Sequence, residues 1–130
     1  MQHNEELSKY RLEQAEGCLK SAKMLLSDED YKGATNRSYY CVFHCMRSVL
    51  ALESVDFKSH SAVISRFRKE YIKTKKLDVL LSDMLTTLFR VRGESDYDDF
   101  YVLRKNDVEE QIKNAEYFLE QVKAYLESQN

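Results

Sequence analysis

The stretch YKGATNRSYYCVFHCMRSVLALES, residues 31–54, decides the fold of this chain. Its apolar residues recur every three or four positions, which is the spacing of one face of an α-helix. The stripe consists of Ala34, Cys41, Cys45, Val49 and Leu52, and it is widened by Tyr39, Tyr40, Val42 and Phe43. A helix that is apolar over so much of its surface contacts several neighbours. We therefore expect residues 31–54 to form the central helix of a bundle.

Helical periodicity also precedes and follows this central segment. Residues 4–27 form the first expected helix, and the polar tract 27–30 both ends it and offers an N-cap for the next helix. A short third helix is expected after Lys58, with Ser59 as its N-cap. The expected core residues are Leu7, Ala15, Cys18, Leu19, Ala22, Leu25 and Leu26 in the first helix, and Val63, Ile64 and Phe67 in the third.

Two more helices are expected in the C-terminal half. Residues 77–92 carry a regular apolar pattern, and Gly93 is a natural helix terminator. Residues 94–105 are expected to form a loop, after which Asn106 caps the last helix with Glu109 at the capping-box position. The expected core residues are Leu77, Leu80, Leu81, Met84, Leu85, Leu88 and Phe89 in the fourth helix, and Val108, Ile112, Ala115, Leu119, Val122 and Leu126 in the last.

The composition favours the same all-α fold. The chain has 130 residues, no proline and three glycines, whereas a β-rich fold of this length needs many turns built from both. A chain of this length can bury one continuous core. We therefore predict that residues 1–130 form a single domain, an antiparallel bundle of four to five helices.

Charge and hydropathy restrict the partners and the compartment. The net charge of −2 and the pI of about 5.9 argue against DNA binding, because such domains usually have a pI above about 9. No apolar run approaches the roughly 18 residues of a membrane helix, and the start MQHNEE has no signal-peptide character. We expect a cytoplasmic protein with no membrane partner, whose three cysteines are small buried hydrophobic residues.

The central helix also carries the residues with the clearest chemical potential. Arg37 and His44 are seven positions apart, so they lie nearly in line on a helix, roughly 10 Å from each other. Arginine grips phosphate through a fork of N–H donors, and histidine can move protons near neutral pH. This pair suits RNA cleavage without a metal, in which Arg37 stabilises the phosphate and His44 handles protons. Two copies meeting at a two-fold axis would complete the site.

Two other interpretations of these residues stay open. An arginine and a histidine can share a helix face by accident, as a surface cation and a hydrogen-bonded ring. Alternatively, Cys41, His44 and Cys45 could supply three zinc ligands from one helix. Structural zinc sites normally draw ligand pairs from two segments, and no second pair exists. We therefore expect no metal and no cofactor.

Three segments in order resemble the HEPN domain family. Residues 31–44, with Asn36-Arg37-Ser38-Tyr39-Tyr40 and Phe43-His44, look like the second helix of these domains. Residues 58–63, Lys58-Ser59-His60-Ser61-Ala62-Val63, are similar to the segment that opens the third helix in short prokaryotic members. Arg90 and Arg92, followed by Asp96-Tyr97, look like the stretch that closes the fourth helix. The resemblance spans residues 31–97.

The resemblance implies a helical bundle that is commonly a homodimer. Many members carry an Arg-x(4–6)-His motif, which Arg37 and His44 match, and are metal-independent endoribonucleases. Prokaryotic members often act as toxins with a minimal nucleotidyltransferase as antitoxin. In one subgroup the partner modifies a tyrosine two residues after the histidine, a position that Met46 occupies in this chain. Other members are inactive and bind nucleotides or proteins, so a non-catalytic interaction module is the alternative function.

The expected site is wider than the catalytic pair. Asn36 and Tyr40 are expected to orient the substrate, which would be RNA or a nucleotide. The resemblance adds further binding residues: Lys58, His60, Arg90, Arg92, Asp96 and Tyr97. For His60, a structural hydrogen bond at the start of the third helix is the competing interpretation. A basic run is a further candidate for RNA contact or a solvated helix end, and it contains Arg66, Arg68, Lys69, Lys73, Lys75 and Lys76.

Overall fold

The structure, a computed structural model, describes residues 2–54, 56–98 and 101–129. Its elements are α1 (Gln2–Ser27), α2 (Tyr31–Ala51), α3 (His60–Phe67), the π-helical turn η1 (Arg68–Ile72), α4 (Val79–Tyr97) and α5 (Lys105–Ser128). No strand occurs in these three ranges. The predicted all-α fold is therefore confirmed.

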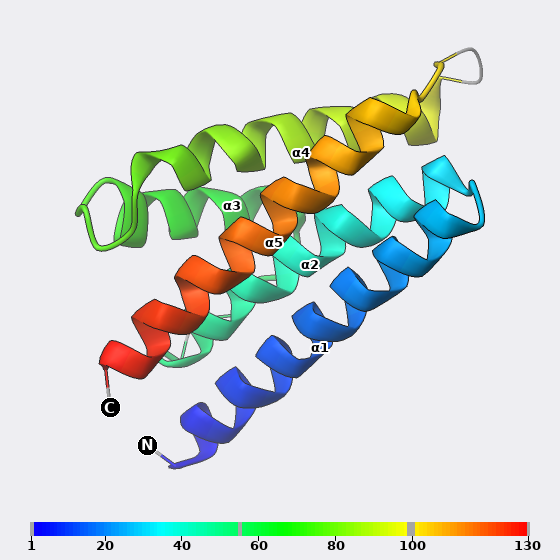
Figure 1. Ribbon diagram of the computed structural model, residues 1–130. Coiled ribbons are helices and arrows are strands. Elements are labelled where there is room, and N and C mark those ends of the chain that lie inside the picture. Colours follow the sequence, from blue (N-terminus) through cyan, green and yellow to red (C-terminus); the bar gives the residue numbers. More distant parts are fainter. Residues whose placement is uncertain (1, 55, 99–100, 130) are drawn as a thin grey trace.

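The helices form an antiparallel bundle around α2 (Figure 1). α1 and α4 run in one direction, while α2 and α5 return in the other, so the two chain ends lie at the same end of the molecule. α2 packs against α1 most extensively and also contacts α3, α4 and α5. The expectation that residues 31–54 supply the central helix is thus confirmed, although α2 ends at Ala51.

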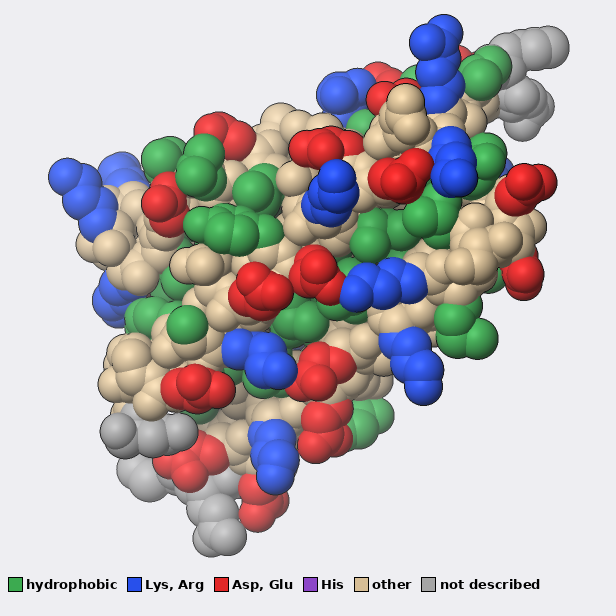
Figure 2. All heavy atoms as spheres, in the orientation of Figure 1, with side chains coloured by type: hydrophobic (Ala, Val, Ile, Leu, Met, Phe, Trp, Pro, Cys, Tyr) green, Lys and Arg blue, Asp and Glu red, His purple; other side chains and the backbone are tan. Residues whose placement is uncertain are grey.

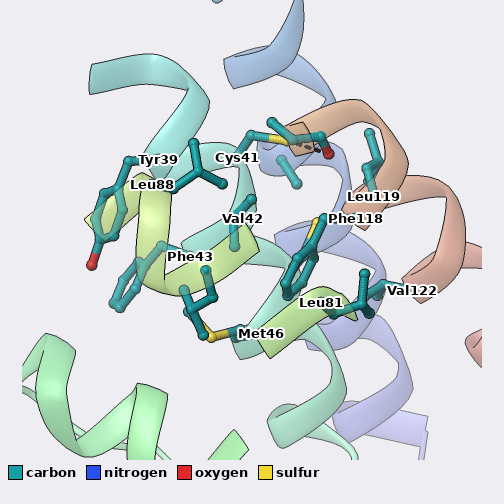
Figure 3. Close-up of a cluster of buried hydrophobic side chains, with 14 of the residues drawn as sticks. Tyr39, Cys41, Val42, Phe43, Met46, Leu81, Leu88, Phe118, Leu119 and Val122 are labelled. Carbon is teal, nitrogen blue, oxygen red and sulfur yellow. Dashed lines mark hydrogen bonds between the residues drawn. The ribbon is translucent and has the colours of Figure 1, made fainter. Parts of the chain in front are cut away.

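One hydrophobic core joins all the helices. Tyr39, Val42 and Met46 of α2 meet Leu81 and Leu88 of α4 and Phe118 of α5 in this core (Figure 3). The residues at the helix crossings are fully excluded from solvent, including Cys41, Cys45, Leu81, Leu85 and Leu88. The three cysteines are free thiols and buried, as expected. The prediction of core positions is wrong for two residues of α4, because Leu80 is 48% exposed and Phe89 is 41% exposed.

Side-chain caps fix the start of three helices. Asp30 accepts a hydrogen bond from Gly33 N at 2.9 Å, Ser59 from Ala62 N at 3.1 Å, and Asp78 from Leu80 N at 2.8 Å. A side chain at Gly33 would not fit, because its Cβ would lie 2.5 Å from Asp30 Oδ2. The N-terminal turn of α2 is therefore locked by a carboxylate and a glycine, which sets the phase of the helix.

The C-terminal half departs from the expected helix ends. α4 continues through Gly93 to Tyr97, and ion pairs Arg90–Glu94 at 3.4 Å and Arg92–Asp96 at 3.8 Å span the glycine. These pairs offset part of the roughly 1 kcal/mol that a helical glycine costs. The last helix begins at Lys105 after Arg104, whose side chain makes no capping hydrogen bond. The predicted cap at Asn106 is thus wrong, because the helix starts one residue before it.

The surface around α1 and α5 carries lysines and arginines interspersed with aspartates and glutamates, and no histidine is visible on that face (Figure 2). In the described residues, no helix is both long and apolar enough to cross a membrane.

Candidate functional site

The central helix reaches solvent along one narrow strip. From residue 34 to residue 51 every α2 side chain is buried except those of Asn36, Arg37, Tyr40, His44 and Arg47. Arg37, Tyr40, His44 and Arg47 follow one another at three or four residues and Asn36 adjoins Arg37, so they share one face. Polar, cationic and titratable groups are therefore concentrated on the one face of residues 34–51 that meets water, and the strip includes the predicted pair Arg37 and His44.

Arg37 is oriented by neutral groups. Its Nε and Nη2 donate hydrogen bonds to Asn36 Oδ1 at 3.2 and 2.8 Å, and its Nη1 lies 3.8 Å from Cys18 Sγ of α1. The guanidinium carbon stands 5.0 Å from the centre of the Tyr40 ring. None of the ion pairs within the described ranges involves Arg37. Its positive charge is thus positioned without a carboxylate and can receive an anion.

His44 is half-buried and held in its neutral form. Its Nδ1 is buried with no hydrogen-bond partner, and its ring centre lies 6.3 Å from that of Tyr40. Burial, followed by the positive charges of Arg47, Arg37 and Arg11, lowers the pKa of His44 below its ordinary value near 6.5. A neutral imidazole at pH 7 can accept a proton, which is the state that a general base requires.

Two cations beside His44 are not predicted by the sequence motifs. Arg47 follows His44 by three residues on the same strip, and Arg11 of α1 donates from Nη1 to Arg47 O at 3.2 Å. Both guanidiniums contact the Asp56 carboxylate, at 3.3 Å from Arg11 and 3.1 Å from Arg47. The helical phase of Arg47 was a usable signal, since it lies three residues after His44. Arg11 had none, because only tertiary packing brings α1 to this place.

His60 sits behind the strip in an aromatic cluster. Its Nδ1 lies 3.0 Å from the hydroxyl of Tyr39, and its ring centre is 4.2 Å from that of Phe43. Burial raises the pKa of the enclosed Tyr39 to about 12, so its hydroxyl keeps its proton. Burial and the charges of Arg92 and Arg47 lower the pKa of His60. The hydrogen bond at the start of α3 matches the structural interpretation of this histidine.

α4 borders the strip through Arg92 and Asp96. The guanidinium of Arg92 stacks over Tyr39 at 4.5 Å and lies 5.9 Å from the centre of the Tyr40 ring. Asp96, which pairs with Arg92, also lines a cavity of about 370 Å³ together with Asn36 and Arg37. The cavity lies at the N-terminal end of α2 and is bounded there by Asp30, Lys32 and Gly33. It gives one end of the strip enough room for a nucleotide-sized group.

The remaining predicted binding residues lie away from this cluster. Arg90 is exposed, pairs with Glu94 and lines a separate groove of about 490 Å³ between α3 and α4. Tyr97 is 86% exposed at the end of α4. Lys58 is exposed in the segment that precedes α3. Their assignment as binding residues stays a prediction, whereas Asn36, Tyr40, His60, Arg92 and Asp96 gather around Arg37 and His44.

The basic run, residues 66–76, contains two arginines that make contacts within the fold and four lysines that are exposed. Arg66 pairs with Glu70 at 3.5 Å, and Arg68 donates from Nε to Ser82 Oγ at 3.0 Å. These two side chains therefore join α3 and η1 to their neighbours. The exposed members are Lys69 within η1, and Lys73, Lys75 and Lys76 in the turn that follows it. This turn joins η1 to α4 (Figure 1). This end of the bundle is distinct from the strip on α2.

Within the part of the chain that the structure describes, no three or more histidine, cysteine, aspartate or glutamate side chains gather as metal ligands. Cys41 and Cys45 are fully buried in the core, whereas His44 is partly exposed. The geometry therefore does not support the alternative zinc site from Cys41, His44 and Cys45.

The fold and the strip define a class of protein: an all-α bundle whose central helix presents an arginine and a histidine, two turns apart, to solvent. The HEPN domain model matches residues 8–125, and the chain belongs to the HEPN domain family.

Similar proteins are found in archaea and bacteria. "Putative toxin MJ0142" of Methanocaldococcus jannaschii is 34% identical over 130 residues, which covers 100% of this chain and 88% of that protein. A "UPF0332 protein" of Thermotoga maritima is 31% identical over 127 residues, covering 98% of this chain and 96% of that protein. "Putative toxin MJ0605" of M. jannaschii is 27% identical over 115 residues, covering 88% and 85%. The matched lengths indicate relatives of the same size and architecture.

Proposed function

We propose that this protein is a toxin-like endoribonuclease that cleaves single-stranded RNA without a metal ion and acts as a homodimer. The observation that carries the proposal is the strip itself. The Arg37 guanidinium, which pairs with no carboxylate in the described ion pairs, and a neutral histidine, His44, share the one face of residues 34–51 that reaches solvent. Two relatives carry toxin in their names, which supports the same class of function.

The proposed chemistry needs few groups because RNA supplies its own nucleophile. Neutral His44 accepts the proton of the 2′-hydroxyl as that oxygen bonds to phosphorus. Arg37, held by Asn36, stabilises the negative charge that develops on the phosphate. The bond from phosphorus to the 5′-oxygen breaks, and that oxygen takes up a proton from solvent or from the imidazolium that His44 has become by accepting the 2′ proton. The products are a 2′,3′-cyclic phosphate and a 5′-hydroxyl. Tyr40, beside both residues, offers a face for a base to stack on.

The expected pH dependence follows from the lowered pKa of His44. Protonation removes the base, so the cleavage rate should fall about tenfold per pH unit once the pH drops below the His44 pKa, and that midpoint should lie below 6.5. Initial rates between pH 4.5 and 8 measure this. Circular dichroism must accompany the rates. Because the pKa values of His44 and His60 are depressed in the folded chain, the unfolded chain binds more protons below pH 6.5, and folding stability declines there too. A rate that rises on acidification would contradict the assignment.

The homodimer is expected to form over α2 and the adjoining surface of α4. One strip offers one Arg37 and one His44, and the neighbouring Phe89 is 41% exposed although its ring centre lies 5.9 Å from that of Tyr39. A second copy would cover this ring and place its own strip opposite the first. Sedimentation at micromolar concentration should give twice the 15.4 kDa chain mass. Phe89→Glu should give monomers of unchanged helicity and little cleavage. A wild-type protein that sediments only as a monomer would rule out the shared site.

A nucleotidyltransferase antitoxin is the proposed protein partner, as the family resemblance implies. If such a partner controls this protein, it does not do so by modifying the position two residues after His44. That position is Met46, which has no hydroxyl and is fully buried between helices. The control that we propose for this chain is masking of the α2 strip by the partner. Co-expression should yield a complex in which cleavage is blocked while Met46 and the tyrosines keep their unmodified masses.

A further inference from the structure

Two guanidiniums from different helices and one adjacent backbone N–H converge on one carboxylate near His44. Asp56, in the segment between α2 and α3, accepts hydrogen bonds from Arg11 Nη2 at 3.3 Å and from Arg47 Nη2 at 3.1 and 3.3 Å. Its Oδ1 also accepts from the backbone N–H of Phe57 at 3.0 Å. Forked guanidiniums and a backbone N–H are the donors that proteins use for phosphate oxygens as well as for carboxylates.

Positive charge exceeds negative charge around Asp56. Two guanidiniums share one carboxylate, and Arg37 on the same strip has no carboxylate partner among the described ion pairs. Arg11 is deeply placed, with 7% of its side chain exposed, whereas the Asp56 side chain is 57% exposed. Arg47 Nε is buried and has no hydrogen-bond partner. The helices therefore hold Arg11 and Arg47 in place. Their shared counter-ion, the Asp56 carboxylate, is exposed and can be exchanged for another anion.

The location suits a substrate phosphate. Arg47 follows His44 by three residues, about 4.5 Å along the helix axis. Arg37 lies on the other side of His44 on the same strip. An RNA strand whose scissile phosphate is bound by Arg37 would therefore run along the strip, past His44, towards Arg11 and Arg47.

We infer that Asp56 occupies a second phosphate-binding position, formed by Arg11, Arg47 and the Phe57 N–H, and that a phosphate of the RNA strand next to the scissile one replaces it. The inference rests on the proposed function for its substrate. It extends that function by naming a subsite that sets the direction of the strand. Asp56 then acts as a stand-in anion that keeps the arginines in place until RNA arrives.

Binding of an uncleavable strand tests this subsite separately from catalysis. The probe is a 2′-O-methyl oligonucleotide, whose blocked 2′-oxygen cannot attack. Asp56→Asn should bind the probe about three- to tenfold more tightly than wild type, because the competing anion is gone. Arg47→Gln should bind it about tenfold more weakly. The slope of log affinity against log salt should also be shallower for Arg47→Gln by about 0.7, the value for one lost single-strand phosphate contact.

Matched controls remove the same charges elsewhere. Asp83→Asn takes an exposed carboxylate from α4, and Arg104→Gln takes an exposed guanidinium before α5. Both should bind the probe as wild type does, apart from a small uniform salt effect. Loss of thermal stability in Asp56→Asn is expected under every interpretation, because the carboxylate also links α1 to α2. The probe affinity is therefore the deciding quantity.

Each outcome decides between the interpretations. If Asp56→Asn binds no more tightly than Asp83→Asn and Arg47→Gln binds like Arg104→Gln, Asp56 is a structural link only and the subsite is wrong, even if wild type cleaves RNA. If the variants shift binding as expected but no RNA is cut, the subsite stands and the proposed catalysis fails. Tighter binding of inorganic phosphate alone, with no change for the oligonucleotide, would assign the position to a free phosphate and overturn the RNA subsite.

Discussion

Replacement of His44 by alanine should lower the rate of RNA cleavage about 10²–10⁴-fold, the usual contribution of a general acid–base group. The imidazole is half-buried, and burial followed by the charges of three arginines keeps it neutral at pH 7, the state in which it can accept a proton. Arg37→Ala should cost about 10²–10³-fold, as loss of one stabilising donor does in preorganised sites. Single-turnover rates with a labelled single-stranded RNA measure both losses.

Controls of the same residue types make this result specific. His3→Ala removes an exposed histidine near the start of α1, and Arg104→Ala removes an exposed arginine before α5. Both should cleave at the wild-type rate, and all four variants should keep wild-type helicity and dimer mass. If His44→Ala and Arg37→Ala cut as fast as wild type, the activity belongs to another site or to a contaminant. If wild type itself cuts no RNA, the strip is a docking surface and the non-catalytic alternative holds.

Replacement of Phe118 by alanine should lower the free energy of unfolding by about 3–5 kcal/mol, the usual cost of removing a core phenylalanine. The ring is fully buried, with its centre 5.6 Å from that of Phe67, at the place where α5 meets α2 and α4 (Figure 3). A loss of this size is a large part of the roughly 5–15 kcal/mol that stabilises a typical domain.

Urea denaturation at one fixed protein concentration measures this loss, because dimerisation would otherwise make stability depend on concentration. Tyr97→Ala is the matched control: its ring is 86% exposed, so the change should stay within about 0.5 kcal/mol. A Phe118→Ala loss below about 1 kcal/mol would show that α5 does not pack on the core as described.

Much of the fold follows from local patterns in the sequence. The apolar spacing predicts α1, α2 and α5 to within a few residues, because one face of each helix must be buried. The end of α4 differs from its prediction because glycine is only a weak helix terminator. Gly93 meets no steric demand, and the ion pairs that cross it keep the helix going to Tyr97. Leu80 and Phe89 belong to the apolar pattern of α4 but are exposed, since spacing alone does not fix how wide the buried face is.

The candidate site also has features that the sequence predicts and features that depend on tertiary packing. Arg37, Tyr40 and His44 share a helix face by local geometry, so their alignment is predictable from spacing alone. The contacts that give them their properties are tertiary. Burial by the packed helices is the main cause of the lowered pKa of His44, ahead of the charges of Arg47, Arg37 and Arg11, and the cavity beside Arg37 depends on Asp96 from α4. No pattern within one segment contains that information, and only the packed bundle brings these residues together.

Cleavage of an RNA that contains one 2′-deoxy nucleotide tests the central claim most directly. The proposed site supplies no nucleophile and uses the 2′-hydroxyl of the substrate, next to a neutral His44 and a free Arg37. In EDTA, wild-type protein should therefore cut the all-ribose strand and leave 2′,3′-cyclic phosphate ends, or their hydrolysis product. It should not cut at the bond that follows the 2′-deoxy nucleotide. Cleavage at that bond, products with a 5′-phosphate, or loss of all activity in EDTA would each contradict the account.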